Sequence, residues 1–207
     1  MSLVVIGGHS RNVGKTSVVA GLISALPERS WLAIKITQIG HGVCSVNGES
    51  CDCADDEHTW TISEERDRSG QSDTSRFLVA GARRSLWARC KQGYLAEAMP
   101  DLRREISTAA DVILESNTVM RFLRPDLYLP VLDFATADFK DSAREYLDLA
   151  SALIVHQPAP GSTPAWEGVS LKPASSRPVF YIRPPQYLTP EIVEFVRSRL
   201  AQPAQAR

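Results

Sequence analysis

The sequence predicts an α/β protein in which helices cover both faces of a mainly parallel β-sheet. Three observations support this prediction. An apolar strand at 3–6 leads through glycines into a helix, a second apolar strand at 111–115 ends in a carboxylate, and further strands alternate with helical segments. Strands and helices that alternate along a chain build a parallel sheet between two helical layers.

The first strand runs directly into a glycine-rich loop. Gly7 and Gly8 open the loop, and Gly14-Lys15-Thr16 closes it before an apolar helical run at 18–26. In such a loop, backbone N–H groups and the positive end of the helix dipole bind phosphate oxygens, the lysine reaches the β- and γ-phosphates, and the threonine hydroxyl binds Mg²⁺. The predicted nucleotide-binding residues are Gly8, Ser10, Arg11, Asn12, Val13, Gly14, Lys15, Thr16 and Ser17.

One position departs from the usual motif, in which four residues separate the first glycine from Gly-Lys-Thr. His9 stands where that glycine is expected, and Gly8 precedes it. Either the loop is one residue longer, or His9 takes the place of the glycine. A chance Gly-Lys-Thr in an ordinary turn is the alternative, but the strand before the loop and the helix after it favour a phosphate-binding loop.

Composition limits the class of protein. The 207 residues are 43% hydrophobic with a formal net charge of −1, which is usual for a globular protein and gives no reason to expect a nucleic-acid partner. We expect one domain at 1–200 and a flexible tail at 201–207. Since no apolar run approaches the ~20 residues of a membrane span and no secretory signal is recognisable, we expect a cytoplasmic protein without membrane association.

The second strand is expected at 31–36, with Lys35 near its carboxyl end. Because ligands of a parallel sheet bind at the carboxyl ends of its strands, Lys35 either points at a bound phosphate or is a solvated lysine. From 37 to 73 the alternation of strands and helices lapses, and we expect an irregular insertion that contains cysteines. Such segments are commonly functional. Asp73 is expected to cap the helix that follows.

The irregular insertion carries a cluster of metal-binding residue types: Cys44, Cys51, Cys53 and His58. Four thiolate and imidazole ligands are the number that a closed tetrahedral zinc site requires, and the histidine favours zinc over an iron–sulfur cluster. The spacing is not that of a common zinc finger. Unrelated thiols and a redox-sensitive loop are therefore the alternatives.

The strand at 111–115 reads Asp-Val-Ile-Leu-Glu. An apolar strand that ends in a carboxylate delivers an acidic group to Mg²⁺ or its water in P-loop proteins. Glu115 is at the end where the phosphates are expected, whereas Asp111 begins the strand and is expected to orient it. The predicted Mg²⁺ ligands are Thr16, Asp73 and Glu115, and the predicted catalytic residues are Lys15, Lys35 and Glu115.

The rest of the chain continues the alternation. Strands are expected at 83–89, 126–133, 152–156 and 178–182, and helices at 93–110 (interrupted at Pro100), 142–149 and 189–200. Arg121 and Arg124 either bind anions at the same sheet edge or are surface arginines. His156 either faces a base or caps the sheet edge, and the guanine-reading Asn-Lys-x-Asp is absent there, so the base stays open.

Between 8 and 115 the chain resembles the molybdopterin-guanine dinucleotide biosynthesis adaptor family, the MobB-type P-loop GTPases. The order and spacing of short motifs carry the resemblance: 8–17, 33–35, 72–76, 80–82 and 110–115. The resemblance implies a three-layer P-loop NTPase-like fold, bound GTP, a Mg²⁺ requirement and slow hydrolysis. It also implies a homodimer and a protein partner in molybdenum cofactor biosynthesis.

The spacing Gly-x5-Gly-Lys-Thr with Val13 is also similar to dethiobiotin synthetase and its cobyrinate-amidase relatives. These enzymes activate a carboxylate with ATP, which implies that Lys35 would hold the carbamate or the phosphate. Three functions therefore stay open. They are a Mg²⁺-dependent GTP- or ATP-binding adaptor with slow NTPase activity in cofactor biosynthesis, an ATP-dependent synthetase for a small carboxylate, and a metal-binding sensor or chaperone module.

Overall fold

The sheet is built outward from an inner strand, β1 (Ser2–Gly8), which is buried after its first residue. In this computed structural model, which describes residues 1–39 and 59–201, β1 pairs in parallel with β5 (Asp111–Glu115) on one side and β6 (Leu127–Leu132) on the other. A strand covered on both faces and both edges meets no water, which explains why its sequence is an unbroken apolar run. This places the glycine-rich loop at the centre of the sheet's carboxyl edge.

The eight strands follow the order β3-β4-β2-β5-β1-β6-β7-β8. All neighbours in this part of the chain pair in parallel, except that β3 runs antiparallel to β4. The other strands are β2 (Leu32–Ile39), β3 (Trp60–Glu64), β4 (Arg84–Lys91), β7 (Leu153–His156) and β8 (Val179–Ile182). The helices are α1 (Lys15–Ala25), α2 (Asp73–Val79), α3 (Leu95–Ser107), α4 (Asp141–Arg144) and α5 (Pro190–Ala201).

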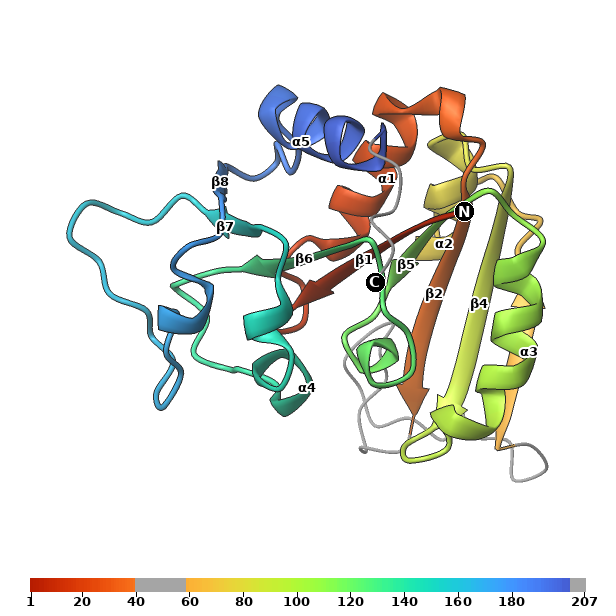
Figure 1. The fold of residues 1–207 in the computed structure, drawn as a ribbon, viewed down its shortest axis with the longest axis horizontal. Helices are drawn as coiled ribbons and strands as arrows, with labels where there is room; N and C mark the ends of the chain where they lie inside the picture. Colours follow the sequence, from red (N-terminus) through yellow and green to blue (C-terminus); the bar gives the residue numbers. More distant parts are fainter. Residues whose placement is uncertain (40–58, 202–207) are drawn as a thin grey trace.

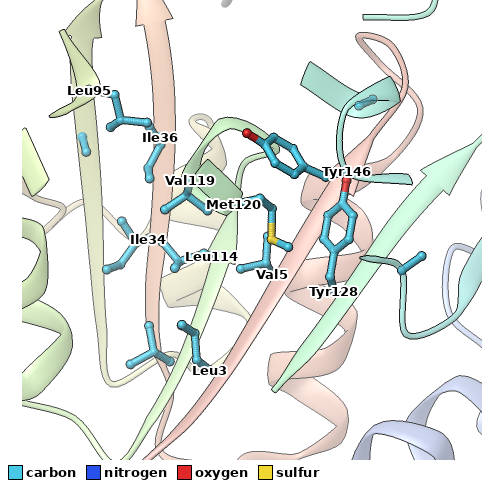
Figure 2. Packing of buried hydrophobic residues seen from close by; sticks show 14 of the residues in the cluster. Leu3, Val5, Ile34, Ile36, Leu95, Leu114, Val119, Met120, Tyr128 and Tyr146 are labelled. Atoms are coloured by element: carbon cyan, nitrogen blue, oxygen red, sulfur yellow. The ribbon is translucent and has the colours of Figure 1, made fainter. Parts of the chain in front are cut away.

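Helices cover both faces of the sheet (Figure 1). Helices α1, α2 and α5 contribute to one hydrophobic cluster, and α3 and α4 contribute to the other. Successive residues of a strand point to opposite faces, so Val4 joins the first cluster and Val5 the second. Figure 2 shows Leu114 of β5 between Val5 of β1 and Ile34 of β2. The predicted α/β sheet in three layers is confirmed.

The irregular insertion predicted at 37–73 is shorter than expected. Residues 37–39 continue β2, and Trp60–Glu64 forms β3 at the edge of the sheet. Trp60 and Ile62 alternate with polar residues and pack against the core, which is the pattern of a half-buried antiparallel strand. The run is only five residues long and stands among charged residues, so its alternation is a weak signal in the sequence. Residues 40–58 lie outside the described part of the chain.

Three helix boundaries also differ from the prediction. Ser72, rather than Asp73, caps α2, because its hydroxyl accepts the N–H of Ser75. Pro100 lies inside α3 and does not interrupt it, since the apolar positions Leu95, Ala98, Met99, Leu102 and Ile106 continue one buried stripe across it. The helix expected at 142–149 is a short α4 followed by a 3₁₀ turn. No helix within 1–39 and 59–201 is both long and apolar enough to cross a membrane.

Candidate phosphate-binding site

The glycine-rich loop joins the end of β1 to the first turn of α1. Helix α1 begins at Lys15, with the carbonyl of Gly14 accepting the N–H of Val18 at 3.0 Å. Gly14 has a φ of 90°, and a Cβ at this position would overlap the ring of Tyr187. Both facts require glycine there. The loop therefore turns sharply into the helix, as phosphate binding by backbone N–H groups demands.

Asn117, which the sequence analysis did not single out, holds the start of the loop. Its side-chain oxygen accepts the N–H of Gly8 at 2.9 Å, and its amide donates to the carbonyl of Gly8 at 2.8 Å. A Cβ at Gly7 would overlap this side chain. The sequence shows only that Asn117 is an amide two residues after the acidic strand. This position alone does not predict a hydrogen bond to the loop.

Thr16, Lys35, Asp73 and Glu115 form one group, which we call the metal side of the loop. The Thr16 hydroxyl donates to Glu115 Oε2 at 2.8 Å, and the Lys35 ammonium donates to Glu115 Oε1 at 3.2 Å. Lys35 also donates to Asp73. The start of α1, the middle of β2, the end of β5 and the start of α2 thus bring together all four residues that the sequence placed here.

The donors on the metal side suit Mg²⁺. Two carboxylates and a hydroxyl offer only oxygen, and Mg²⁺ prefers oxygen ligands, of which proteins supply one or two carboxylates while phosphates and water complete the shell. Within the described residues no group of three or more His, Cys, Asp or Glu side chains could form an all-protein metal site. The Lys35 ammonium pairs with both carboxylates and offsets part of their negative charge.

Burial changes the acidity of both lysines. It lowers the pKa of Lys15 from 10.5 to about 8, and the Glu115 carboxylate opposes this only in part. Burial also disfavours charge on Lys35, but Glu115 and Asp73 outweigh it and raise its pKa. Lys15 donates to the carbonyl of Ser10 at 2.7 Å and has no carboxylate in contact within the described residues. An added phosphate would restore its full charge.

On the opposite flank, which we call the β6 side, the loop contacts the segment after β6. The β6 side consists of His9, Ser10, Asp138 and Lys140. His9 is fully buried and follows Gly8, the last residue of β1. Its ring packs against Phe139 and Trp166, with centroids 5.2 and 5.1 Å away. Burial lowers the pKa of His9.

The other candidate residues make separate contacts, outside the metal side and the β6 side. Arg76 donates to the Ser17 hydroxyl at 3.0 Å. His156 contacts the carbonyl of Val13 at 2.9 Å and therefore supports the loop backbone. Arg124 donates to backbone carbonyls of its own turn. Asp111 pairs with Arg29 at 3.1 Å, which agrees with an orienting role.

Arg121 lines a cavity of about 270 Å³ beyond the ends of β2 and β5. Polar side chains in its walls include Gln38, Gln92, Thr118 and Glu145. Gln38 is three residues after Lys35 on β2, and Thr118 is three residues after Glu115. The cavity therefore lies at the same edge of the sheet as the phosphate loop.

The predicted zinc ligands Cys44, Cys51, Cys53 and His58 lie outside the described residues. Cys90, the remaining cysteine, is buried on β4, and burial raises the pKa of its thiol to about 11. It is therefore an inert core residue.

The similarity of this chain to known proteins is a similarity of fold. No protein-family model and no curated protein matches the chain. HypB from Helicobacter pylori, in complex with nickel, aligns with 100% of this chain and 92% of its own at 14% identity and a TM-score of 0.50. MobB from Bacillus subtilis aligns with 96% of this chain and 98% of its own at 15% identity and a TM-score of 0.43.

A third solved structure is LpxK from Aquifex aeolicus, in complex with ATP. It aligns with 87% of this chain at 15% identity and a TM-score of 0.46, and this chain spans about half of it, 53%. The loop geometry and the likeness to HypB decide the fold. This chain has a P-loop NTPase fold. All three proteins are P-loop NTPases, and one is a MobB, the family that the sequence resembles.

Proposed function

We propose that this protein binds Mg²⁺ and a nucleoside triphosphate, GTP or ATP, at the P-loop and hydrolyses the nucleotide slowly. One observation carries the proposal. The hydroxyl of Thr16, at the start of the P-loop helix, lies 2.8 Å from the carboxylate of Glu115, at the end of the acidic strand. A hydroxyl and a carboxylate meeting beside a phosphate cradle form the arrangement that holds Mg²⁺ against the β- and γ-phosphates.

Each residue of the site has a defined task in this proposal. Backbone N–H groups from 10 to 16 and the Lys15 ammonium bind the β- and γ-phosphates. Thr16, Glu115 and Asp73 would hold Mg²⁺, which supplies charge neutralisation on the phosphate oxygens. Glu115 also orients water for attack on the γ-phosphorus, so that the bond to the bridging oxygen breaks and a nucleoside diphosphate leaves.

Lys35 gives the metal side its charge balance. Its ammonium lies between Glu115 and Asp73, so two carboxylates share one cation before nucleotide binds. With the carboxylates of Glu115 and Asp73 holding Mg²⁺, the Lys35 ammonium would be free to donate to phosphate oxygens on which charge develops during transfer. Catalysis then rests on positioning and charge stabilisation, as is general for phosphoryl transfer.

The biological role that we propose is that of an adaptor in the biosynthesis of the molybdenum cofactor or another cofactor. The support is the resemblance of the sequence motifs between 8 and 115 to MobB-type proteins. Under this proposal the protein works as a homodimer and engages a protein partner.

A thermal-shift panel tests nucleotide binding. GTP, ATP and their diphosphates are added to the wild type, to Lys15→Ala and to Lys172→Ala, with Mg²⁺ or with a chelator. Lys172 is exposed and far from the P-loop in the sequence, so it is the matched control. A ligand at 1,000 times its Kd stabilises the native state by about 4 kcal/mol. With Mg²⁺ present, we expect nucleotide to raise the melting temperature of the wild type and of Lys172→Ala. The melting temperature of Lys15→Ala should not rise.

If Lys15→Ala is stabilised as strongly as the wild type, the P-loop does not bind the phosphates and the proposal is wrong. The chelator arm tests the metal separately. Stabilisation that is equal with and without Mg²⁺ would remove Thr16, Asp73 and Glu115 from the metal site while leaving the nucleotide at the loop.

The second candidate is an ATP-dependent synthetase that activates a small carboxylate. The cavity of about 270 Å³ favours it, because a second substrate needs a space of its own at the sheet edge, and Arg121 offers a partner for an anionic group. Product formation with a panel of small carboxylates, compared with bare hydrolysis, distinguishes the two functions. If no carboxylate raises the rate of ATP cleavage, the synthetase is excluded.

A further inference from the structure

The segment between β6 and α4 is fastened to the P-loop at three points. The N–H of Lys140 donates to the carbonyl of His9 at 2.8 Å, and the Ser10 hydroxyl donates to the Asp138 carboxylate at 2.7 Å. The His9 ring contacts the carbonyl of Thr136 at 3.3 Å. Because two of these contacts involve the backbone of the segment, the position of residue 140 beside the P-loop depends little on side-chain rotamers.

An aromatic cluster supports these contacts from behind. Phe139 and Trp166 lie 5.2 Å apart and both pack on His9, while Phe134 packs edge-on against Trp166. Trp166 is only 6% exposed. Close packing of this kind keeps the segment in one arrangement, so the backbone of Lys140 has a fixed place beside the P-loop.

The charge of Lys140 belongs to the phosphate site. Burial lowers its pKa, Arg11 lowers it further, and the carboxylates of Asp138 and Glu115 oppose the change. Lys140 in turn lowers the pKa of Lys15. Its charge therefore lies close to both flanks of the P-loop.

Lys140 differs from the other two lysines in its partners. Lys15 donates to a backbone carbonyl and Lys35 to two carboxylates. In the ranges 1–39 and 59–201, no atom accepts a hydrogen bond from the half-buried ammonium of Lys140. A cation that loses water without gaining a partner costs free energy, and an arriving anion would remove that cost.

We propose that Lys140 is the third cation of the phosphate site and contacts the terminal phosphate of the bound nucleoside triphosphate. This inference rests on the proposed function and adds to it a preference for the triphosphate over the diphosphate. Lys140 is held next to His9 and Ser10, at the opening of the P-loop, whereas Lys15 and Thr16 are at its helical end. A diphosphate that fills the helical end leaves Lys140 without a partner, so Lys140 favours the triphosphate.

Calorimetric titration tests the inference on the full chain. The ligands are a non-hydrolysable triphosphate and the diphosphate of the base that the wild type prefers, both with Mg²⁺. The proteins are the wild type, Lys140→Ala, Lys140→Met, Lys140→Arg and the exposed control Lys172→Ala. Lys140→Met retains the apolar stem of the side chain and guards against a folding defect, which the melting temperature without ligand monitors.

We expect Lys140→Ala and Lys140→Met to weaken triphosphate binding by about 10- to 100-fold, the usual effect of removing a charged hydrogen bond. Diphosphate binding should change by less than about threefold, because the proposed contact is absent there. Lys140→Arg should recover most of the loss. Equal weakening of both ligands, or no weakening of either, overturns the inference.

The outcome separates this inference from the proposed function. If the wild type binds the triphosphate, Lys15→Ala does not, and Lys140→Ala binds like the wild type, only the role of Lys140 is wrong. If the wild type binds neither ligand, both proposals are wrong.

Discussion

The metal side and the β6 side of the P-loop are built from different interactions. On the metal side the charges are paired: Lys35 joins Asp73 to Glu115, and Thr16 donates to Glu115. On the β6 side, backbone hydrogen bonds and packed aromatic rings hold the segment that carries Lys140. Under the proposed function, the metal side must exchange partners when nucleotide binds, whereas the β6 side is already in place.

The largest effect is expected on the β6 side when its aromatic support is removed. Trp166→Ala should lower the free energy of unfolding by about 3 kcal/mol, because a large buried ring leaves a cavity. Denaturant unfolding measures this. Trp87→Ala is a suitable comparison, since Trp87 is only half buried on β4 and should cost less. Equal losses in the two variants would mean that the aromatic cluster adds no special rigidity.

On the metal side, Glu115→Gln should weaken Mg²⁺ binding. The amide oxygen still accepts the Thr16 hydroxyl, but a charged metal ligand and one of the two carboxylate partners of Lys35 are lost. We expect the Mg²⁺ concentration for half-maximal nucleotide binding to rise about 10- to 100-fold. The exposed residue Glu167 offers a matched control, Glu167→Gln. An unchanged Mg²⁺ dependence would contradict the assignment of Glu115.

The acidity of Lys15 gives a smaller effect, which also tests whether the P-loop receives a phosphate. In the free protein burial holds its pKa at about 8, and phosphate raises it again. Above pH 8 the neutral lysine must therefore take up a proton when nucleotide binds. Affinity should be constant below that pKa and fall about tenfold between pH 7 and pH 9.

Titration calorimetry in two buffers of different ionisation enthalpy counts the protons directly. The expected uptake approaches one proton per nucleotide at pH 9 if Lys15 dominates, and Lys140, whose pKa burial also lowers, adds in the same direction. No proton uptake at pH 9 would show that neither lysine meets the phosphates.

The smallest effect concerns His9 on the β6 side. Burial lowers its pKa from the ordinary 6.5, with Asp133 opposing and Lys15 reinforcing the change. The unfolded chain therefore binds a proton more readily than the folded protein. The stability linked to His9 is fully present above pH 6.5 and is lost as the pH falls towards the folded pKa. His9→Gln should lose this dependence between pH 6.5 and 5, measured by denaturant unfolding.

Much of the metal side could be predicted from the sequence because its residues belong to recognisable elements. Glu115 ends the apolar strand β5, Lys35 lies opposite it on the apolar strand β2, and Thr16 is two residues after Gly14 of the P-loop. Parallel strands bring such ends to one edge by geometry alone. Asp73 is the first residue of α2 rather than its cap, which is Ser72. It still lies near Lys35, because α2 begins at the same edge of the sheet.

The β6 side could not be predicted, for a physical reason. Asp138 and Lys140 stand in an irregular segment, and their contacts with Ser10 and His9 span well over a hundred residues of sequence. No periodicity encodes such pairs. The same holds for Asn117, whose two hydrogen bonds to Gly8 depend on the path of the chain after β5.

The most direct test of the central claim is a crystal structure of the protein with Mg²⁺ and a non-hydrolysable nucleoside triphosphate. The account predicts that the β- and γ-phosphates lie against the backbone of 10–16 and the Lys15 ammonium, with Mg²⁺ between Thr16 and Glu115 and Lys140 at the terminal phosphate. A triphosphate bound anywhere else on the chain, with Thr16 still donating to Glu115, would contradict it.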